Sequence, residues 1–275
     1  MFKYMKYEIR GTYKYILGVL ALVLVLTTAL YYYISRPANQ TSGLGQLFVA
    51  LSVLILFGTT LATFLYIVGS FRKELYEDTG YLTFTLPLTG NQIVGSKLVV
   101  ASLWFMVLAV VIGIYNIILV SIFAPIEVSI SELFSSLFHI ISIRYILFII
   151  VYSIFSIVNM LVVVYFSMAI SRITFRNKRI GGLWFIIFLI LNAVLAYGLA
   201  YVSQAFPYYI DLDTLKIGTM DTLNRFHMEF NDSSISVSAN ASGLITNIAA
   251  IIYSIVETVG LFLATGYLID RKIDL

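Results

Sequence analysis

Six long apolar stretches constrain this chain more than any other feature of its sequence. They are residues 16–33, 47–71, 98–123, 145–170, 183–206 and 244–269. A helix of about 20 apolar residues crosses a bilayer, because lipid offers no partner to an unpaired backbone group. The stretches lack the polar faces that long helices of a soluble bundle would need. We therefore expect an all-α integral membrane protein with six transmembrane helices.

The composition agrees with a single membrane domain over residues 1–275. Only 11% of the residues are charged and 60% are hydrophobic, with a mean hydropathy of +0.96. A soluble domain carries about a quarter charged residues, so this chain has too little charge to cover a water-facing surface. Cysteine is absent, which excludes disulfides and thiolate metal sites. His139 and His227 have no neighbours at metal-ligand spacing, so no metal site is predicted.

Basic residues set the expected orientation. Of the 17 lysines and arginines, all but Arg36, Arg144, Lys216 and Arg225 fall on one side of the predicted spans. Lysine and arginine gather on the cytoplasmic side of membrane proteins. Both termini are therefore predicted to be cytoplasmic, and residues 207–243 extracellular.

The first 14 residues predict an amphipathic helix at the membrane interface. On a helical wheel, one stripe is basic and consists of Lys3, Lys6, Arg10 and Lys14. A second stripe, about a quarter-turn away, is apolar and consists of Phe2, Met5, Ile9 and Tyr13. Such a helix lies along the inner leaflet with its lysines at the headgroups. An ordinary basic flank that only sets orientation is the alternative.

The cytoplasmic loop at residues 72–97 is the most informative segment. Its first residues can continue the second helix, and Thr79-Gly80 would end that helix. Residues 81–87 are apolar and aromatic although the loop faces water, which is typical of a docking surface. Thr89 with Gln92 has the spacing of a capping box at the start of the next helix. A loop that dips into the membrane without a partner is the alternative.

The residue order in this loop resembles the segment after the second span of bacterial ABC-2-type permeases. The matching residues are Glu77-Asp78, Gly80-Tyr81-Leu82, Thr85-Leu86-Pro87 and Lys97. In that family the loop is a coupling helix that seats in a groove on a separate ATPase subunit. The resemblance implies that the coupling residues here are Glu74, Glu77, Asp78, Gly80, Tyr81, Leu82, Leu86, Pro87 and Thr89.

The resemblance also implies the function and the partners. The chain would be the permease subunit of an ATP-driven exporter in the bacterial plasma membrane. It would pair with a second permease chain, identical or related, and with two cytoplasmic ATPase subunits that bind ATP and Mg²⁺. The chain itself would be no enzyme and hold no cofactor. Its only near-match to a phosphate-binding loop, residues 90–97, has serine and lysine in the wrong order.

The loop at residues 207–243 departs from the family pattern. Members often place apolar re-entrant helices there, whereas this loop has only a thin apolar pattern at Ile210, Leu212, Leu215 and Ile217. It then becomes rich in serine and asparagine between residues 231 and 242, which predicts a flexible linker.

Glu257 is the one acid deep within a predicted span. Because an ionised carboxylate is costly there, it should face the bundle interior and find polar neighbours. The candidates are Asn159, Asn192, Ser254 and Thr258. Glu257 would line the transport path, couple transport to protons, or simply hydrogen-bond between helices, and the sequence does not choose among these.

The nearly uncharged spans favour a hydrophobic or amphipathic cargo, such as a membrane-active peptide, a lipid or a drug. Two other classes of function stay open. One is a secondary transporter or channel that works without an ATPase, and the other is a membrane immunity or scaffold protein. We expect no nucleic-acid partner.

Overall fold

A computed structural model describes residues 2–35, 43–76, 87–123, 143–174, 182–212, 215–219, 226–231, 234–239 and 245–271. Six of its helices are long and apolar enough to cross a membrane, judged by length and composition. They are α1 (Phe2–Ile34), α3 (Gly43–Tyr76), α5 (Gly90–Phe123), α7 (Ile143–Thr174), α8 (Leu183–Ala205) and α10 (Ile248–Arg271). The predicted multi-pass helical membrane protein is confirmed at this level, and each predicted span overlaps one of these helices. The sixth, predicted over residues 244–269, begins only at Ile248, because residues 245–247 form a strand.

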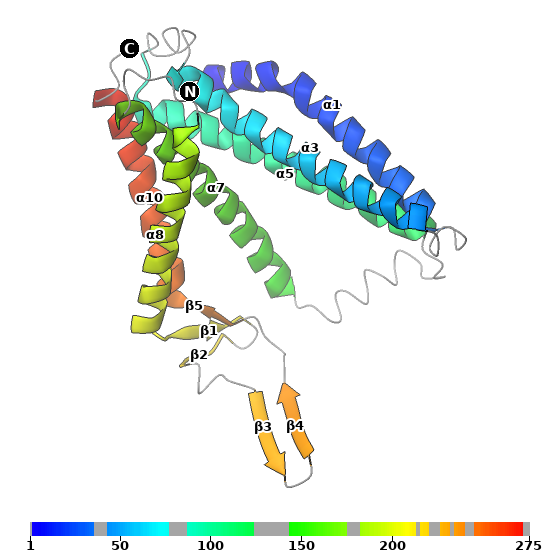
Figure 1. The fold of residues 1–275 in the computed structure, drawn as a ribbon. Helices are drawn as coiled ribbons and strands as arrows, with labels where there is room; N and C mark the ends of the chain where they lie inside the picture. The colour runs from blue at the N-terminus through cyan, green and yellow to red at the C-terminus, as the bar shows by residue number, and fades with distance from the viewer. Residues whose placement is uncertain are drawn as a thin grey trace.

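The six helices form two groups of three. Helices α1, α3 and α5 pack side by side, and α7, α8 and α10 form the second group (Figure 1). The groups meet at the end where both termini lie, through contacts of α5 with α7 and α10 and of α3 with α7, and they diverge toward the opposite end. Both termini therefore lie on the same side, as an even number of spans requires.

The buried core lies where the two groups meet. It is built from the last third of α3, the first half of α5 and the second half of α7, with Trp184 of α8 and Ile269 of α10 at its margin. The ring of Phe71 stacks on that of Tyr165 at 4.2 Å between centroids and so joins α3 to α7. Away from this end, apolar side chains such as Phe57 and Val110 face outward. In a membrane, lipid would cover them.

Helix α1 differs from the prediction. The interfacial helix expected for residues 1–14 is continuous with the first span, and α1 bends near its N-terminal end (Figure 1). The basic stripe of Lys3, Lys6, Arg10 and Lys14 is exposed as predicted. However, Met5 and Ile9 of the apolar stripe pack against the protein core instead of lipid.

The described residues between α8 and α10 include five short strands. The sequence predicted a loop at four of them and the start of the sixth span at the last, residues 245–247. Strands β1 (Tyr209–Asp211), β2 (Ile217–Gly218) and β5 (Ile245–Asn247) form an antiparallel sheet in the order β2-β1-β5. Strands β3 (Phe226–Asn231) and β4 (Ser234–Ala239) form a hairpin. All-α thus describes only the membrane-crossing part of the chain.

The flexible linker predicted for residues 231–242 is wrong for the span of β4. Serines there alternate with Ile235, Val237 and Ala239, and this period of two is that of a strand. The prediction weighed the serine content and missed the alternation.

Asn247 joins the two helices that flank the sheet. Its Nδ2 donates to the carbonyl oxygens of Ser203 (3.2 Å) and Phe206 (3.1 Å), which end α8. Its Oδ1 accepts a hydrogen bond from the backbone N–H of Ala250 at 2.8 Å. An asparagine at this position caps the first turn of a helix, so one side chain closes α8 and opens α10.

At the opposite end, α5 and α10 touch through glycine. The backbone N–H of Gly90 donates to Asp270 Oδ1 at 2.6 Å. A Cβ atom on Gly266 would overlap the Asn91 side chain and lie 3.0 Å from the Asn91 backbone nitrogen. Only glycine permits so close an approach of two helices.

Replacing Gly266 by alanine should therefore separate the first turn of α5 from α10. We expect Gly266→Ala to lower the free energy of unfolding by about 1–3 kcal/mol, as over-packing does. Gly260→Ala in the same helix is the control, because a Cβ there meets nothing within 4 Å. Thermal unfolding of the purified protein in detergent measures both, and equal midpoints would contradict the close contact.

Candidate functional site

A buried ionic cluster ties the first three helices together. Lys97 of α5 has a side chain only 3% exposed, and its Nζ lies 2.8 Å from Glu8 Oε1 of α1 and 2.9 Å from Glu74 Oε1 of α3. It also donates to Ser70 Oγ at 2.7 Å. The Tyr4 hydroxyl donates to Glu74 Oε1 at 2.6 Å. The two salt bridges of Lys97 therefore link α1, α3 and α5.

Burial explains why the cluster is so densely bonded. A buried ammonium group loses its hydration, and only close counter-charges and hydrogen bonds offset that loss. Here two carboxylates face one lysine, and one oxygen of Glu74 is buried without a hydrogen-bond partner. A cavity of about 440 Å³ lies beside the cluster, between α1 and α3. The cluster thus serves first as a lock between α1, α3 and α5.

Two residues of the cluster also appear in the sequence analysis. Glu74, one of the coupling residues that the resemblance implies, pairs with Lys97 and Tyr4 inside the chain, and its side chain is only 13% exposed. Lys97, the lysine that opens the third span in the resemblance, is buried. Sequence reasoning did not single out Glu8. Its signal was the four-residue spacing of Tyr4, Glu8 and Thr12, which places three polar groups on one helix face.

Of the predicted coupling residues, only three lie among the described residues. They are Glu74, Pro87 and Thr89, whereas Glu77, Asp78, Gly80, Tyr81, Leu82 and Leu86 lie outside them. Pro87 is exposed, just before α5. The predicted capping box is confirmed, because Thr89 N donates to Gln92 Oε1 (3.2 Å) and Gln92 N donates to Thr89 Oγ1 (3.4 Å). Helix α5 begins at the next residue, Gly90.

The polar residues predicted around Glu257 are only partly brought together. Asn159 Nδ2 of α7 donates to Thr258 Oγ1 at 2.8 Å and lies 3.4 Å from Glu257 Oε1 of α10. Ser254 and Asn192 instead donate to backbone carbonyls of their own helices. Asn159, Glu257 and Thr258 therefore form one polar contact between α7 and α10.

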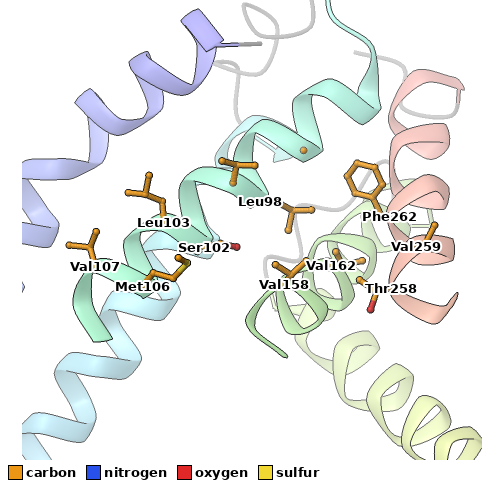
Figure 2. A pocket seen from close by; sticks show the side chains of 12 residues that line it. Leu98, Ser102, Leu103, Met106, Val107, Val158, Val162, Thr258, Val259 and Phe262 are labelled. Carbon is orange, nitrogen blue, oxygen red and sulfur yellow. The ribbon is translucent and has the colours of Figure 1, made fainter. Parts of the chain in front are cut away.

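An apolar groove of about 670 Å³ lies between α5, α7 and α10. Figure 2 shows Leu98, Leu103 and Met106 of α5 on one side of it, with side chains of α7 and α10 on the other. The lining includes Thr258 but neither Asn159 nor Glu257, and its surface is almost wholly apolar. Val259, another lining residue, is 51% exposed. The groove is therefore open at the surface of the bundle.

No group of three histidine, aspartate or glutamate side chains within the described residues could hold a metal ion. Comparisons with protein-family models, with curated proteins and with solved structures found no match to this chain. Fold and site together define a helical, multi-pass membrane protein with an ionic lock at one end and an apolar groove between its two helix groups.

Removing the Lys97 ammonium should destabilise the bundle strongly. We expect Lys97→Met to cost about 3–5 kcal/mol, because two buried carboxylates would lose their counter-charge. Lys73→Met is the control, because Lys73 lies near the same cavity but is exposed. Combining Lys97→Met with Glu8→Gln and Glu74→Gln should restore most of the lost stability. Thermal unfolding in detergent measures all three, and an unaltered Lys97→Met midpoint would contradict the lock.

The side-chain amides of Asn159 and Asn192 should contribute differently to the stability of the protein. Asn159→Ala removes a hydrogen bond between helices, which is worth about 0.6–1.7 kcal/mol in membrane proteins. Asn192→Ala removes only a bond to the carbonyl of its own helix. We expect a lower unfolding midpoint for the first variant and no change for the second. Equal midpoints would show that the α7–α10 contact adds nothing to stability.

Proposed function

We propose that this chain is the permease subunit of an ATP-driven exporter of the ABC-2 type, which moves a hydrophobic or amphipathic cargo out of a bacterial cell. Two copies, or this chain and a related one, would form the membrane part. Two cytoplasmic ATPase subunits would bind ATP and Mg²⁺ and drive transport. The observation that supports this best is how the loop resembling a coupling helix is anchored at both ends.

On the α3 side, the anchor is the ionic cluster. Glu74 lies three residues before the loop segment 77–86, and its carboxylate contacts Lys97 of α5 and Tyr4 of α1. A displacement of this segment would therefore reach three helices at once. Tyr76, the last residue of α3, adds a contact with α7, because its hydroxyl donates to the Met168 carbonyl at 3.1 Å.

On the α5 side, the anchor is the contact with α10. The capping box fixes the start of α5, and the Gly90 N–H bonds the Asp270 carboxylate of α10. The segment is thus attached to both three-helix groups, at the end where they meet. A push there would rock one group against the other, which is how ATPase closure would alternate the inward-open and outward-open arrangements.

The contact surface for the ATPase would consist of Glu77, Asp78, Tyr81, Leu82 and Leu86, with Gly80 and Pro87 shaping the chain. Glu74 is left out, since its charge is used within the bundle. The position of the basic residues supports a cytoplasmic location, because Lys3, Lys6 and Arg10 are exposed at the same end. The cargo class is supported by the apolar groove between α5, α7 and α10.

A secondary transporter is the second candidate, and one observation favours it. The polar contact of Glu257 with Asn159 lies in the middle of two membrane-crossing helices, where transporters place coupling groups. This candidate predicts transport without any ATPase.

The loop variants test the proposal. We expect the tagged chain, purified in mild detergent from the cells that produce it, to carry ATP hydrolysis with it. Tyr81→Ala combined with Leu82→Ala should abolish that activity without changing the unfolding midpoint, because only the docking contact is lost. Tyr208→Ala is the control, since Tyr208 is exposed at the sheet end of the molecule.

Two results would contradict the exporter. One is a chain that purifies without any ATP-hydrolysing companion. The other is labelling of a cysteine placed at residue 81 by a membrane-impermeant reagent added outside intact cells.

A further inference from the structure

The cavity of about 440 Å³ between α1 and α3 borders the ionic cluster. Two glycines keep it open. Gly11 of α1 and Gly69 of α3 both line it, and a Cβ atom on either would meet nothing within 4 Å. Sites for small molecules have volumes of about 300–1,000 Å³. The cavity is therefore large enough for the headgroup of a lipid.

The inner side of the cavity carries surplus negative charge. Glu8 and Glu74 both line it, and within the described residues Lys97 is the one cation that pairs with them. Glu8 accepts from Lys97 and Ser70 through Oε1, so in the same part of the chain its Oε2 has no hydrogen-bond donor. The unpartnered oxygen of Glu74 is buried, whereas Glu8 Oε2 is not. A molecule in the cavity can therefore reach Glu8, and an ammonium group would supply the missing donor.

The mouth of the cavity is basic. Lys73 of α3 lines it and is exposed. Two more exposed lysines lie on α1 next to lining residues. Lys3 is four residues before Tyr7, and Lys14 is three residues after Gly11. Residues at these spacings lie on the same face of a helix. The mouth therefore attracts an anionic group, whereas the inner side attracts a cationic one.

The cavity also has an apolar side. Leu65 and Tyr66 of α3 line it, and Leu65 is 47% exposed. Leu65 precedes Lys73 by eight residues, so it lies roughly 12 Å farther from the end of α3 at Tyr76. In a membrane-crossing helix this direction leads toward the hydrocarbon. The order of the lining, charged toward the helix end and apolar toward the bilayer, is also the order of groups in a phospholipid.

We propose that this cavity binds phosphatidylethanolamine from the surrounding bilayer. Its ammonium group would contact Glu8, its phosphate would contact Lys73, and its acyl chains would pass Leu65. The lipid is a resident ligand beside the ionic lock and not the cargo. The inference thus goes beyond the exporter assignment and does not depend on it.

Charge complementarity selects this headgroup. The ammonium group of phosphatidylethanolamine has three N–H donors, and a carboxylate that is partly withdrawn from water attracts it strongly. Phosphatidylcholine carries a cation without an N–H donor, and phosphatidylglycerol carries a phosphate without any cation. Both would meet the basic mouth through their phosphate but leave Glu8 Oε2 without a donor.

Native mass spectrometry of the purified chain, with one palmitoyl-oleoyl lipid added at a time, counts the lipids that bind. We expect phosphatidylethanolamine to bind at least about tenfold more tightly than phosphatidylcholine or phosphatidylglycerol. Equal affinity for phosphatidylethanolamine and phosphatidylcholine would overturn the proposal. Phosphatidylglycerol that bound as tightly would also overturn it, because the basic mouth alone would then hold the lipid. Soluble phosphoethanolamine should bind far more weakly than the lipid, and equal binding would refute a lipid ligand.

Two variants separate the ammonium contact from the phosphate contact. Glu8→Gln keeps the shape and leaves Lys97 paired with Glu74, so it should weaken phosphatidylethanolamine binding by about tenfold and leave phosphatidylcholine binding unchanged. Lys73→Met should instead weaken the binding of all three lipids alike. A Glu8→Gln protein that stays folded, as judged by size-exclusion chromatography, and still prefers phosphatidylethanolamine would sink the proposal.

A pair of glycines on α3 tests the cavity without changing the ionic cluster. Gly69 lines the cavity, whereas Gly58 does not, and a Cβ atom on either meets nothing within 4 Å. Gly69→Phe should fill the cavity and abolish the preference for phosphatidylethanolamine, while Gly58→Phe should retain it. If Gly69→Phe kept the preference, the lipid would bind elsewhere and the proposed site would be wrong.

Discussion

The salt bridges of Lys97 are the interaction on which the arrangement of the first three helices depends. An ammonium group buried without counter-charges costs several kcal/mol, so α5 can pack only where α1 and α3 bring carboxylates to it. Glu8 and Glu74 do so from two different helices. Nearby, the Trp104 indole N–H donates to Thr12 Oγ1 at 2.9 Å, which adds a second polar tie between α1 and α5. The register of α1, α3 and α5 is thereby fixed at one end, and the apolar core forms beside it.

The packing of the six helices differs between the two ends of the molecule. Contacts are dense where the helix groups meet, and beyond that end they spread apart (Figure 1). On α5 the ionic lock and the groove occupy the same stretch of the helix, because Gly95 and Leu98 of the groove lining lie on either side of Lys97 in the sequence. The contact of Gly90 with Asp270 of α10 lies at the start of the same helix, and Val259 of α10 lines the groove. A movement at the packed end would change the width of the groove, because α5 and α10 take part in both.

The sequence predicted the six helices well because hydropathy over 20 residues is a strong physical signal. It also predicted the start of α5, since Thr89 and Gln92 interact locally. It could not find the ionic cluster, because charges at a membrane boundary look the same whether they face water or a neighbouring helix. The sequence proposed four polar partners for Glu257. Choosing Asn159 over Asn192 requires knowing how α7 and α8 are oriented about their own axes. That orientation depends on tertiary packing and not on any local pattern.

Asn247 has a consequence for how the second helix group can move. Its amide holds the last turn of α8 and the first turn of α10 through three hydrogen bonds. Asn247 is buried, so breaking all three hydrogen bonds would cost free energy that water could not restore. At the sheet end, α8 and α10 must therefore move together as one rigid body. Any widening of the molecule on that face would therefore move α8 and α10 together, along with α7, away from α1, α3 and α5, and strands β1 and β5 would move with them.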